Sequence, residues 1–426
     1  MFDQTRQRSS RPGNVESVED FLKEFERTTS RLLNEKVLYE DGRKFSPFEK
    51  ELTNAVVELR KEEDYVLAPT DKTGNWTPML TTSYAGKLLG HIEAKCVEVN
   101  NSKLDSVHDE ALILLNQHRG LMNSGEANYI ERWINLRQLL MPQLLVKDHK
   151  NHGEDGEYPT RLLIPATNFT QCFAKMGYKV IKNLFDVNKV SYEHYTLKQA
   201  SCLKNDVEKM KPEIRKETNI HATLDIKNMY PSIRYKLIER AVFHYSRNFD
   251  ENEMAVINVG LEMLKFSISN CLITFQEKYY QYGTETDPIM RALSIGGYDS
   301  AWYADLVACY ILDMTRNSWT KMFLYFKIYR DDGYGITKVS KSVDEMRTWF
   351  KSFQRCVDKL TDNDIVFTME MWMPNEKSRE IEKGILDVIC GNSLPYLDTQ
   401  MSYDSKGRLA FKVYSKPGFN MKHVKR

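Results

Sequence analysis

The sequence predicts an α+β fold organised around a strand hairpin that carries two aspartates at its tip. The run from Phe323 to Thr337 places aromatic and β-branched residues on both sides of Asp331-Asp332-Gly333, which is the pattern of two strands joined by a tight turn. A second apolar strand ends at Asp225, and Pro231 separates it from a helical stretch at 235–245. Strands and amphipathic helices are therefore expected in one fold.

The aspartates at these strand ends are candidate metal ligands. Asp is common in turns for conformational reasons alone, so an isolated Asp-Asp pair indicates little. Two adjacent carboxylates repel one another unless a cation lies between them, and Asp225 adds a third carboxylate at the other strand end. If the two strands are neighbours in one sheet, the three would hold two metal ions about 4 Å apart, an arrangement that serves phosphoryl transfer.

Three segments resemble the conserved motifs of reverse transcriptases. Asp225, followed five residues later by Tyr230, resembles motif A, and Tyr329-Arg330-Asp331-Asp332 resembles motif C. Segment 295–306 resembles motif B, with its key positions occupied by Gly296, Ser300 and Ala304.

The match to these motifs is incomplete at three positions. The two prolines usual in motif B are here Tyr298 and Ala301. Arg330 stands where relatives have a small or aliphatic residue, and a cation beside the metal carboxylates would weaken binding of the second metal ion.

Other segments resemble Penelope-like retroelement reverse transcriptases more specifically. Segment 68–75 is similar to their Ala-Asp-Lys-Gly segment, and segments 394–398 and 413–417 resemble their Phe-Leu-Asp and Tyr-x-Lys-Pro-Thr signatures. Because these motifs occur in the expected order, chance agreement is a poor explanation.

This resemblance implies a right-hand polymerase with fingers, a ferredoxin-like palm of an antiparallel sheet backed by helices, and a helical N-terminal region. The expected domains are an N-terminal extension at 1–65, fingers at 66–220, a palm at 221–400, and the palm end with the start of a missing thumb at 401–426. The thumb is expected to be absent or vestigial, so that a partner or a longer chain would supply it.

The resemblance also implies the roles of individual residues. Catalysis would depend on Asp225, Asp331 and Asp332, and these with Ile226 would form the site for two Mg²⁺ ions, with Mn²⁺ as the alternative. The incoming nucleotide would be bound by Lys72, Lys147 (or Lys150), Arg161, Tyr230, Gly296 and Ser300. An arginine gives planar bidentate donors to phosphate, and the Tyr230 ring would block a 2′-hydroxyl.

The implied activity is RNA-directed DNA polymerisation, in which dNTPs are added to a primer on an RNA or DNA template. An RNA-dependent RNA polymerase is the alternative enzyme, but it usually carries a second Asp at the position of Tyr230 and a Gly at that of Arg330. A domesticated, non-catalytic nucleic-acid scaffold is the third reading; the three retained carboxylates argue against it.

Composition limits these interpretations. Lys plus Arg number 60 against 59 Asp plus Glu, a net charge of +1, so nucleic-acid binding requires basic residues that are locally concentrated. The seven cysteines are scattered, which argues against a disulfide framework and indicates a reducing compartment. No apolar run approaches the roughly 18 residues of a membrane span, so we expect an intracellular protein of the nucleus or cytoplasm, without membrane contact.

Overall fold

The fold was determined as a computed structural model of the chain. It describes residues 64–71, 76–139, 141–147, 158–165, 168–192, 195–210, 214, 219–287, 290–338, 341–373, 378–389, 391–397 and 399–414. The chain divides into two compact units, which are treated separately below. The first comprises 1–106, 137–168 and 272–282, and the second comprises 107–136, 169–271 and 283–426. The predicted helical extension at 1–65 lies almost entirely outside the described residues, and the predicted domain boundaries remain predictions.

The first unit is built from short antiparallel strands and one helix. Its elements are β1 (Tyr65–Pro69), β2 (Trp76–Leu80), α3 (Thr81–Lys95), β3 (Cys96–Val99), β4 (Gln143–Val146), β5 (Thr160–Leu163), β7 (Leu272–Phe275) and β8 (Lys278–Tyr282), and α4 (Asn101–His118) begins in it. Two hairpins are present, because β4 pairs with β5 and β7 pairs with β8. Val66 and Ala68 of β1 share a small core with Val146 of β4.

The second unit contains the strands that carry the candidate carboxylates. Its helices are α5 (Ser124–Leu136), α6 (Gln171–Val187), α7 (Ala200–Met210), α8 (Met229–Ser232), α9 (Tyr235–Tyr245), α10 (Glu251–Ser269), α11 (Ser300–Met314), α12 (Arg316–Met322) and α13 (Val343–Thr361). Its strands are β6 (His221–Ile226), β9 (Phe323–Tyr329), β10 (Asp332–Thr337), β11 (Phe367–Trp372), β12 (Arg379–Glu382), β13 (Leu386–Ile389), β14 (Ser393–Tyr396), β15 (Thr399–Tyr403) and β16 (Leu409–Val413). The predicted helix at 235–245 and the hairpin at 323–337 are confirmed.

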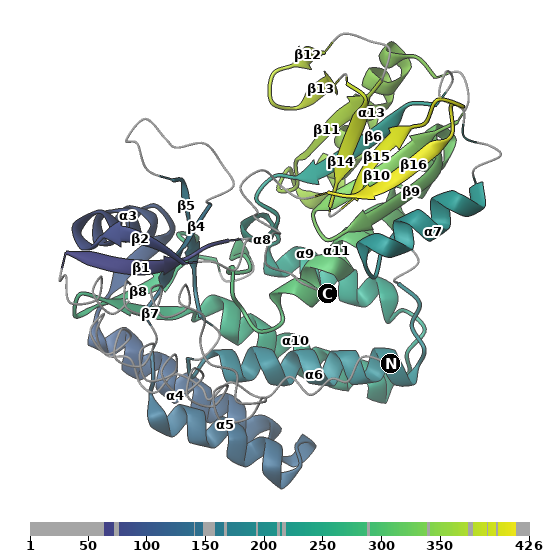
Figure 1. The fold of residues 1–426 in the computed structure, drawn as a ribbon. Helices are drawn as coiled ribbons and strands as arrows, with labels where there is room; N and C mark the ends of the chain where they lie inside the picture. Colours follow the sequence, from purple (N-terminus) through teal and green to yellow (C-terminus); the bar gives the residue numbers. More distant parts are fainter. Residues whose placement is uncertain are drawn as a thin grey trace, which may run out of the picture. The chain divides into compact units, whose positions relative to one another are not determined.

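Strand β6 lies inside the main sheet of this unit (Figure 1). The order of the six-stranded sheet is β12-β13-β11-β6-β10-β9, and β6 pairs antiparallel with both β10 and β11. Helices α9 to α12 separate β6 from β9, and α13 separates β10 from β11. The four strands β11-β6-β10-β9 therefore have the antiparallel order expected of the ferredoxin-like palm.

The two faces of this sheet bury different side chains. Ala222, Leu224 and Ile226 alternate along β6 and belong to the core formed with α9, α10, α11 and α13. Because neighbouring residues of a strand point to opposite faces, His221, Thr223 and Asp225 point away from these helices. The core on that second face contains Tyr334 of β10, Trp372 of β11 and Leu394 of β14.

The three-stranded sheet β14-β15-β16 covers part of this second face, beside β6 and β10 in Figure 1. The covered part is centred on His221, which is fully buried. Its Nδ1 lies 2.6 Å from the Tyr334 hydroxyl and its Nε2 lies 2.6 Å from the Tyr403 hydroxyl of β15. The imidazole therefore contacts Tyr334 of its own sheet through Nδ1 and Tyr403 of the covering sheet through Nε2.

Burial of His221 is expected to make stability depend on pH. Burial lowers the pKa of the imidazole from 6.5 to about 3. Between these values the unfolded chain binds a proton that the folded chain does not, so unfolding becomes easier as the pH falls below 6.5. The free energy of unfolding should drop by about 2 kcal/mol between pH 6.5 and pH 5 through this residue. Urea unfolding at both pH values measures it, and a His221→Gln variant should lose that part of the slope. Equal slopes in the two proteins would contradict the assignment.

None of the described helices is long and apolar enough to cross a membrane. Two consecutive helices follow Asp299, since α11 ends at Met314 and α12 begins at Arg316. The start of a thumb was expected within 401–426, of which 415–426 lie outside the described residues. The absence of a complete thumb remains an expectation.

Candidate active site

The sheet brings the predicted carboxylate positions together. Asp225, near the end of β6, is the direct cross-strand partner of Asp332, the first residue of β10. The backbone N–H of Ile226 donates to the carbonyl oxygen of Asp331 at 3.1 Å, which fixes the register of the two strands at the turn. The condition that these strands are neighbours in one sheet is thus met.

Asp225 and Asp332 lie on one face of the sheet. Directly opposite residues of an antiparallel pair have Cβ atoms about 4.5–5.5 Å apart, and like charges at such positions are destabilising. Asp225 is exposed, whereas Asp331 and Asp332 are half-buried. Two carboxylates held opposite one another at the open end of this face produce a negative potential that a cation would relieve.

The hydroxyl of Tyr396 lies within the negative potential of the same aspartates. It donates to the backbone carbonyl oxygen of Asp332 at 2.8 Å. Burial raises the pKa of this hydroxyl well above 10, and the charges of Asp332 and Asp331 raise the pKa further. Tyr396 belongs to the segment that resembles the Phe-Leu-Asp signature, but its contact with the hairpin could not be predicted, because it depends on how two sheets pack.

The metal itself remains a prediction. Within the described residues, no three side chains of His, Cys, Asp or Glu lie close enough together to form a metal cluster. The donors present are carboxylate oxygens, which are the ligands that Mg²⁺ prefers. Ile226 presents its side chain to the helix-side core, so only its backbone is placed near the aspartates.

Arg330 occupies the turn between β9 and β10. Its φ is 56°, in the left-handed region that non-glycine residues seldom adopt, and this position of a two-residue hairpin turn usually prefers glycine. Its guanidinium carbon lies 5.9 Å from the centre of the Tyr329 ring. The exposed cation therefore stands beside the candidate carboxylates on a backbone that is strained, a combination common at functional sites.

Tyr230 lies close to this turn. It is part of the short helix α8, and its half-buried ring packs against the helix-side core. Burial raises the pKa of its hydroxyl, the charge and hydrogen bond of Arg330 oppose the rise, and the charges of Asp305 and Asp331 add to it. The structure thus places the predicted sugar-selecting residue near Asp331, with Arg330 as a hydrogen-bonding partner.

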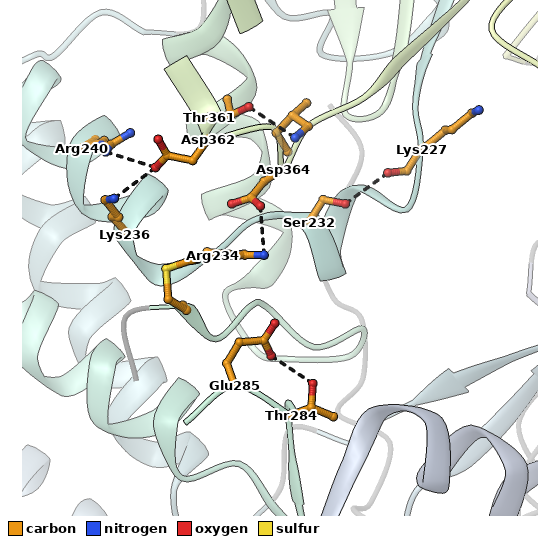
Figure 2. A network of polar contacts seen from close by, with 12 residues as sticks. Lys227, Ser232, Arg234, Lys236, Arg240, Thr284, Glu285, Thr361, Asp362 and Asp364 are labelled. Carbon is orange, nitrogen blue, oxygen red and sulfur yellow. Dashed lines mark hydrogen bonds and ion pairs between the residues drawn. The ribbon is translucent and has the colours of Figure 1, made fainter. Parts of the chain in front are cut away.

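Ion pairs hold the segment that follows Tyr230 (Figure 2). Arg234 pairs with Asp364 at 3.1 Å, and Lys236 pairs with Asp362 at 3.1 Å. Arg240 reaches the same Asp362 at 3.3 Å and donates to the carbonyl oxygen of Leu360 at 2.9 Å. These contacts connect the start of α9 to the end of α13.

The motif B segment begins α11. Gly296 has a φ of 100°, which requires glycine, and a Cβ at Gly297 would lie 2.3 Å from the hydroxyl oxygen of Ser300. Ser300 is 3% exposed. The lack of a side chain at Gly297 thus leaves room for the Ser300 hydroxyl. Because Ser300 is buried, the predicted contact with the nucleotide would have to be made by a buried residue.

Asp299 is a feature that the sequence did not indicate. It is 4% exposed, and among the described residues its Oδ2 has no hydrogen-bond partner. Burial raises the pKa of this carboxyl group to about 7. It lies directly before Ser300, so a group that changes charge near neutral pH adjoins motif B.

Arg161 and Lys147, the predicted triphosphate ligands, belong to the first unit. Arg161 of β5 forms an ion pair with Asp71, its Nη1 lying 3.2 Å from Oδ2. Asp71 precedes the segment 72–75, so Lys72 lies outside the described residues, as does Lys150. The charge of Lys147 lowers the pKa of His91, after burial and Lys95.

Helix α3 adds cations that the sequence analysis missed. The pKa of the Lys95 ammonium is lowered first by burial and also by the charge of Arg161. His91 of the same helix lies 2.9 Å from the Thr160 hydroxyl. Lys147 therefore lies near His91, and Arg161 lies near Lys95. The i, i+4 spacing of His91 and Lys95 indicates that these two share a helix face, but their nearness to the hairpin strands has no local signal.

Comparison with known proteins gives similarity of fold. No family model and no curated protein matches the chain. Among solved structures, telomerase from Candida albicans in complex with a TWJ fragment of telomeric RNA has a TM-score of 0.52 at 9% identity, covering 96% of this chain and 63% of its own. Apo telomerase from Candida tropicalis gives 0.52 at 8% identity, covering 93% and 70%. A form truncated from its C-terminal domain gives 0.51 at 10% identity, covering 93% and 71%. The chain thus has a reverse-transcriptase-like fold, and it spans less than two thirds of the first of these structures.

Proposed function

We propose that this chain is an RNA-directed DNA polymerase of the Penelope-like type, which adds dNTPs to a primer by two-metal phosphoryl transfer. The observation that carries the proposal is the pairing of Asp225 with Asp332 across β6 and β10, with Asp331 in the adjoining turn. The telomerase-like fold supports it, and the TWJ fragment of telomeric RNA held by one of those structures favours RNA as a ligand. We place the protein inside the cell, in the nucleus or cytoplasm.

The candidate carboxylates would hold two Mg²⁺ ions, or Mn²⁺ in their place, with Ile226 contributing from its backbone. Bound there, the ions would supply charge stabilisation to the attacking and leaving oxygens. The sheet positions Asp225 and Asp332 before any ligand arrives, because their strands are paired up to the turn. Tyr396 of β14 also holds this backbone, through its hydrogen bond to the carbonyl oxygen of Asp332.

The resemblance to reverse transcriptases assigns a role to each nucleotide-binding residue. Arg161, Lys147 and Lys72 would bind the triphosphate, with Lys95 nearby adding positive potential. Tyr230 would face the sugar, and Gly296 with Ser300 would shape the floor beneath the base. A primer and an RNA or DNA template complete the substrates, and a partner or a longer chain would supply a thumb.

The role of Arg161 predicts a defect in nucleotide binding. An Arg161→Ala substitution removes charge-assisted hydrogen bonds worth roughly 1.5–3 kcal/mol each, so the KM for dNTP should rise by at least about tenfold. Steady-state primer extension measures this. The matched control is Asp71→Asn, which breaks the ion pair but keeps the guanidinium. If both variants lose thermal stability equally and leave KM unchanged, Arg161 acts only as the partner of Asp71.

Primer extension with purified protein tests the proposed function. RNA and DNA templates, each with a DNA primer, are offered dNTPs or rNTPs in the presence of Mg²⁺ or Mn²⁺. We expect incorporation of dNTPs on both templates and little incorporation of rNTPs. Preferential use of rNTPs would instead identify an RNA polymerase.

A non-catalytic nucleic-acid scaffold is the second candidate function, and Arg330 is the observation that favours it. Arg330 directly precedes Asp331 in the turn, and an exposed cation there would compete with a metal ion for the charge of the carboxylates. Binding of RNA without extension by the wild-type protein would support this candidate. If an Arg330→Leu variant then gained extension activity, Arg330 would be the cause of the missing activity in the wild type.

A further inference from the structure

Helix α6 carries three lysines along its length, and they differ in their partners. Lys179 donates to Glu126 at 2.6 Å, and Lys182 pairs with Asp186 at 2.7 Å. Lys175 makes no ion pair within the part of the chain that the structure describes. Its ammonium instead lies 4.6 Å from the centre of the Tyr129 ring and 5.2 Å from that of the Tyr298 ring.

These contacts define an aromatic cradle formed by Tyr129, Lys175 and Tyr298. Lys175 also donates to the Tyr129 hydroxyl at 3.4 Å. Tyr178 supports the cradle from α6, because its ring packs edge-on against Tyr298 with centroids 6.1 Å apart. Three separate segments of the second unit therefore contribute to one cluster of rings around one cation.

The Tyr298 ring is open to solvent. Its residue is 49% exposed, although it lies between Gly297 and the buried Asp299. The ring, within the segment that resembles motif B, is therefore accessible to a ligand.

We propose that the aromatic cradle Tyr129–Lys175–Tyr298 binds single-stranded nucleic acid, with a base stacked on the Tyr298 ring and a neighbouring phosphate on the Lys175 ammonium. Proteins that bind single strands combine aromatic rings for base stacking with cations that neutralise the backbone. Two rings already orient the ammonium, so little side-chain freedom is lost when a phosphate binds. The inference rests on the proposed function, in which this strand is the template.

The surrounding charges are compatible with an anionic ligand. Glu126 is neutralised by its ion pair with Lys179, and Asp186 by its pair with Lys182. Asp299 adjoins Tyr298, and because burial raises the pKa of its carboxyl group to about 7, part of it is uncharged at neutral pH. The net charge of +1 for the whole chain makes such a local site necessary for any binding of nucleic acid.

Binding of a fluorescein-labelled single-stranded RNA of mixed sequence, measured by anisotropy without nucleotides, tests the inference. A Tyr298→Ala variant should bind roughly five- to hundredfold more weakly, since one stacked base is lost. Tyr298→Phe should keep the affinity of the wild type. Lys175→Ala should bind more weakly and lower the slope of log affinity against log salt by about 0.7, the value for one phosphate of a single strand.

Lys182→Ala is the matched control, because it removes a lysine of the same helix that is already paired with a carboxylate. It should leave affinity and salt slope unchanged. An unchanged affinity for Tyr298→Ala, equal losses for Lys175→Ala and Lys182→Ala, or no binding of this RNA by the wild type would overturn the inference. The binding assay contains no nucleotide, so its result does not depend on polymerase activity. If the wild type binds this RNA through the cradle but fails to extend a primer in the separate extension assay, the proposed polymerase is refuted and the binding site is not.

Discussion

Replacing Asp225, Asp331 or Asp332 with Asn is expected to lower primer extension by at least about a hundredfold, the loss typical when a charge-stabilising group of a transition state is removed. The expectation follows from the cross-strand pairing of Asp225 with Asp332 and from the position of Asp331 in the turn. Single-turnover extension with saturating dNTP measures it. An Asp331→Asn enzyme that extends primers at nearly the wild-type rate would show that the catalytic assignment is wrong.

A second readout separates metal binding from general damage to the fold. Without a divalent ion, removing one of two opposed carboxylates should leave the melting temperature unchanged or raise it, because like charges at paired positions are destabilising. Added Mg²⁺ should raise the melting temperature of the wild type more than that of any of the three variants. Glu370→Gln is the matched control, since Glu370 is an exposed carboxylate on the same face of β11, paired opposite Thr223. It should retain both activity and the response to Mg²⁺.

Replacing Tyr230 with Ala should raise the ratio of rNTP to dNTP incorporation by about tenfold or more, the discrimination that a shape contact in a binding pocket commonly gives. The ring stands on α8 near Asp331, where it would meet the 2′ carbon of a nucleotide whose phosphates lie at the carboxylates. Trimming a steric block makes room, so part of the dNTP activity should remain. Competition between labelled dNTP and rNTP measures the ratio.

Two variants distinguish this role from plain packing. Tyr230→Phe keeps the ring and removes the hydrogen bond to Arg330, so the ratio should stay at the wild-type value if the block is steric. If Tyr230 serves the core instead, Tyr230→Ala should lose thermal stability and both activities together, because its half-buried ring packs against the helix-side core. An unchanged ratio with normal melting would remove the main reason to assign deoxynucleotides as substrates.

The sequence predicted the elements of the site well because their signals are local. Alternating aromatic and β-branched residues on both sides of Asp331-Asp332 specify two strands, and Pro231 marks the start of a helical segment. The pairing of β6 with β10 was predicted only as a condition, since no local pattern says which strands are neighbours. The observed register then decides that Asp225 and Asp332 share a face, because a shift by one residue would place them on opposite faces.

Contacts between distant segments account for what the sequence did not predict. The pair of Arg161 with Asp71 spans 90 residues, and the contact of His221 with Tyr403 spans 182 residues. Neither has a periodic signature, because each depends on the packing of separate sheets or hairpins. The positive φ of Arg330 is likewise set by the turn geometry that the two strands impose, against the preference of the residue itself.

The interior position of β6 gives the backbones of Asp225 and Asp331 different freedom to move. Asp225 stands on a strand hydrogen-bonded on both sides, to β10 and to β11, so moving its backbone would require both ladders to open together. Asp331 stands in a turn of only two residues beyond the ends of β9 and β10, where opening is local. Amide hydrogens of β6 are therefore expected to exchange more slowly than those of the turn, which hydrogen exchange would measure. A ligand that spans both aspartates would order the turn against a strand that is already rigid.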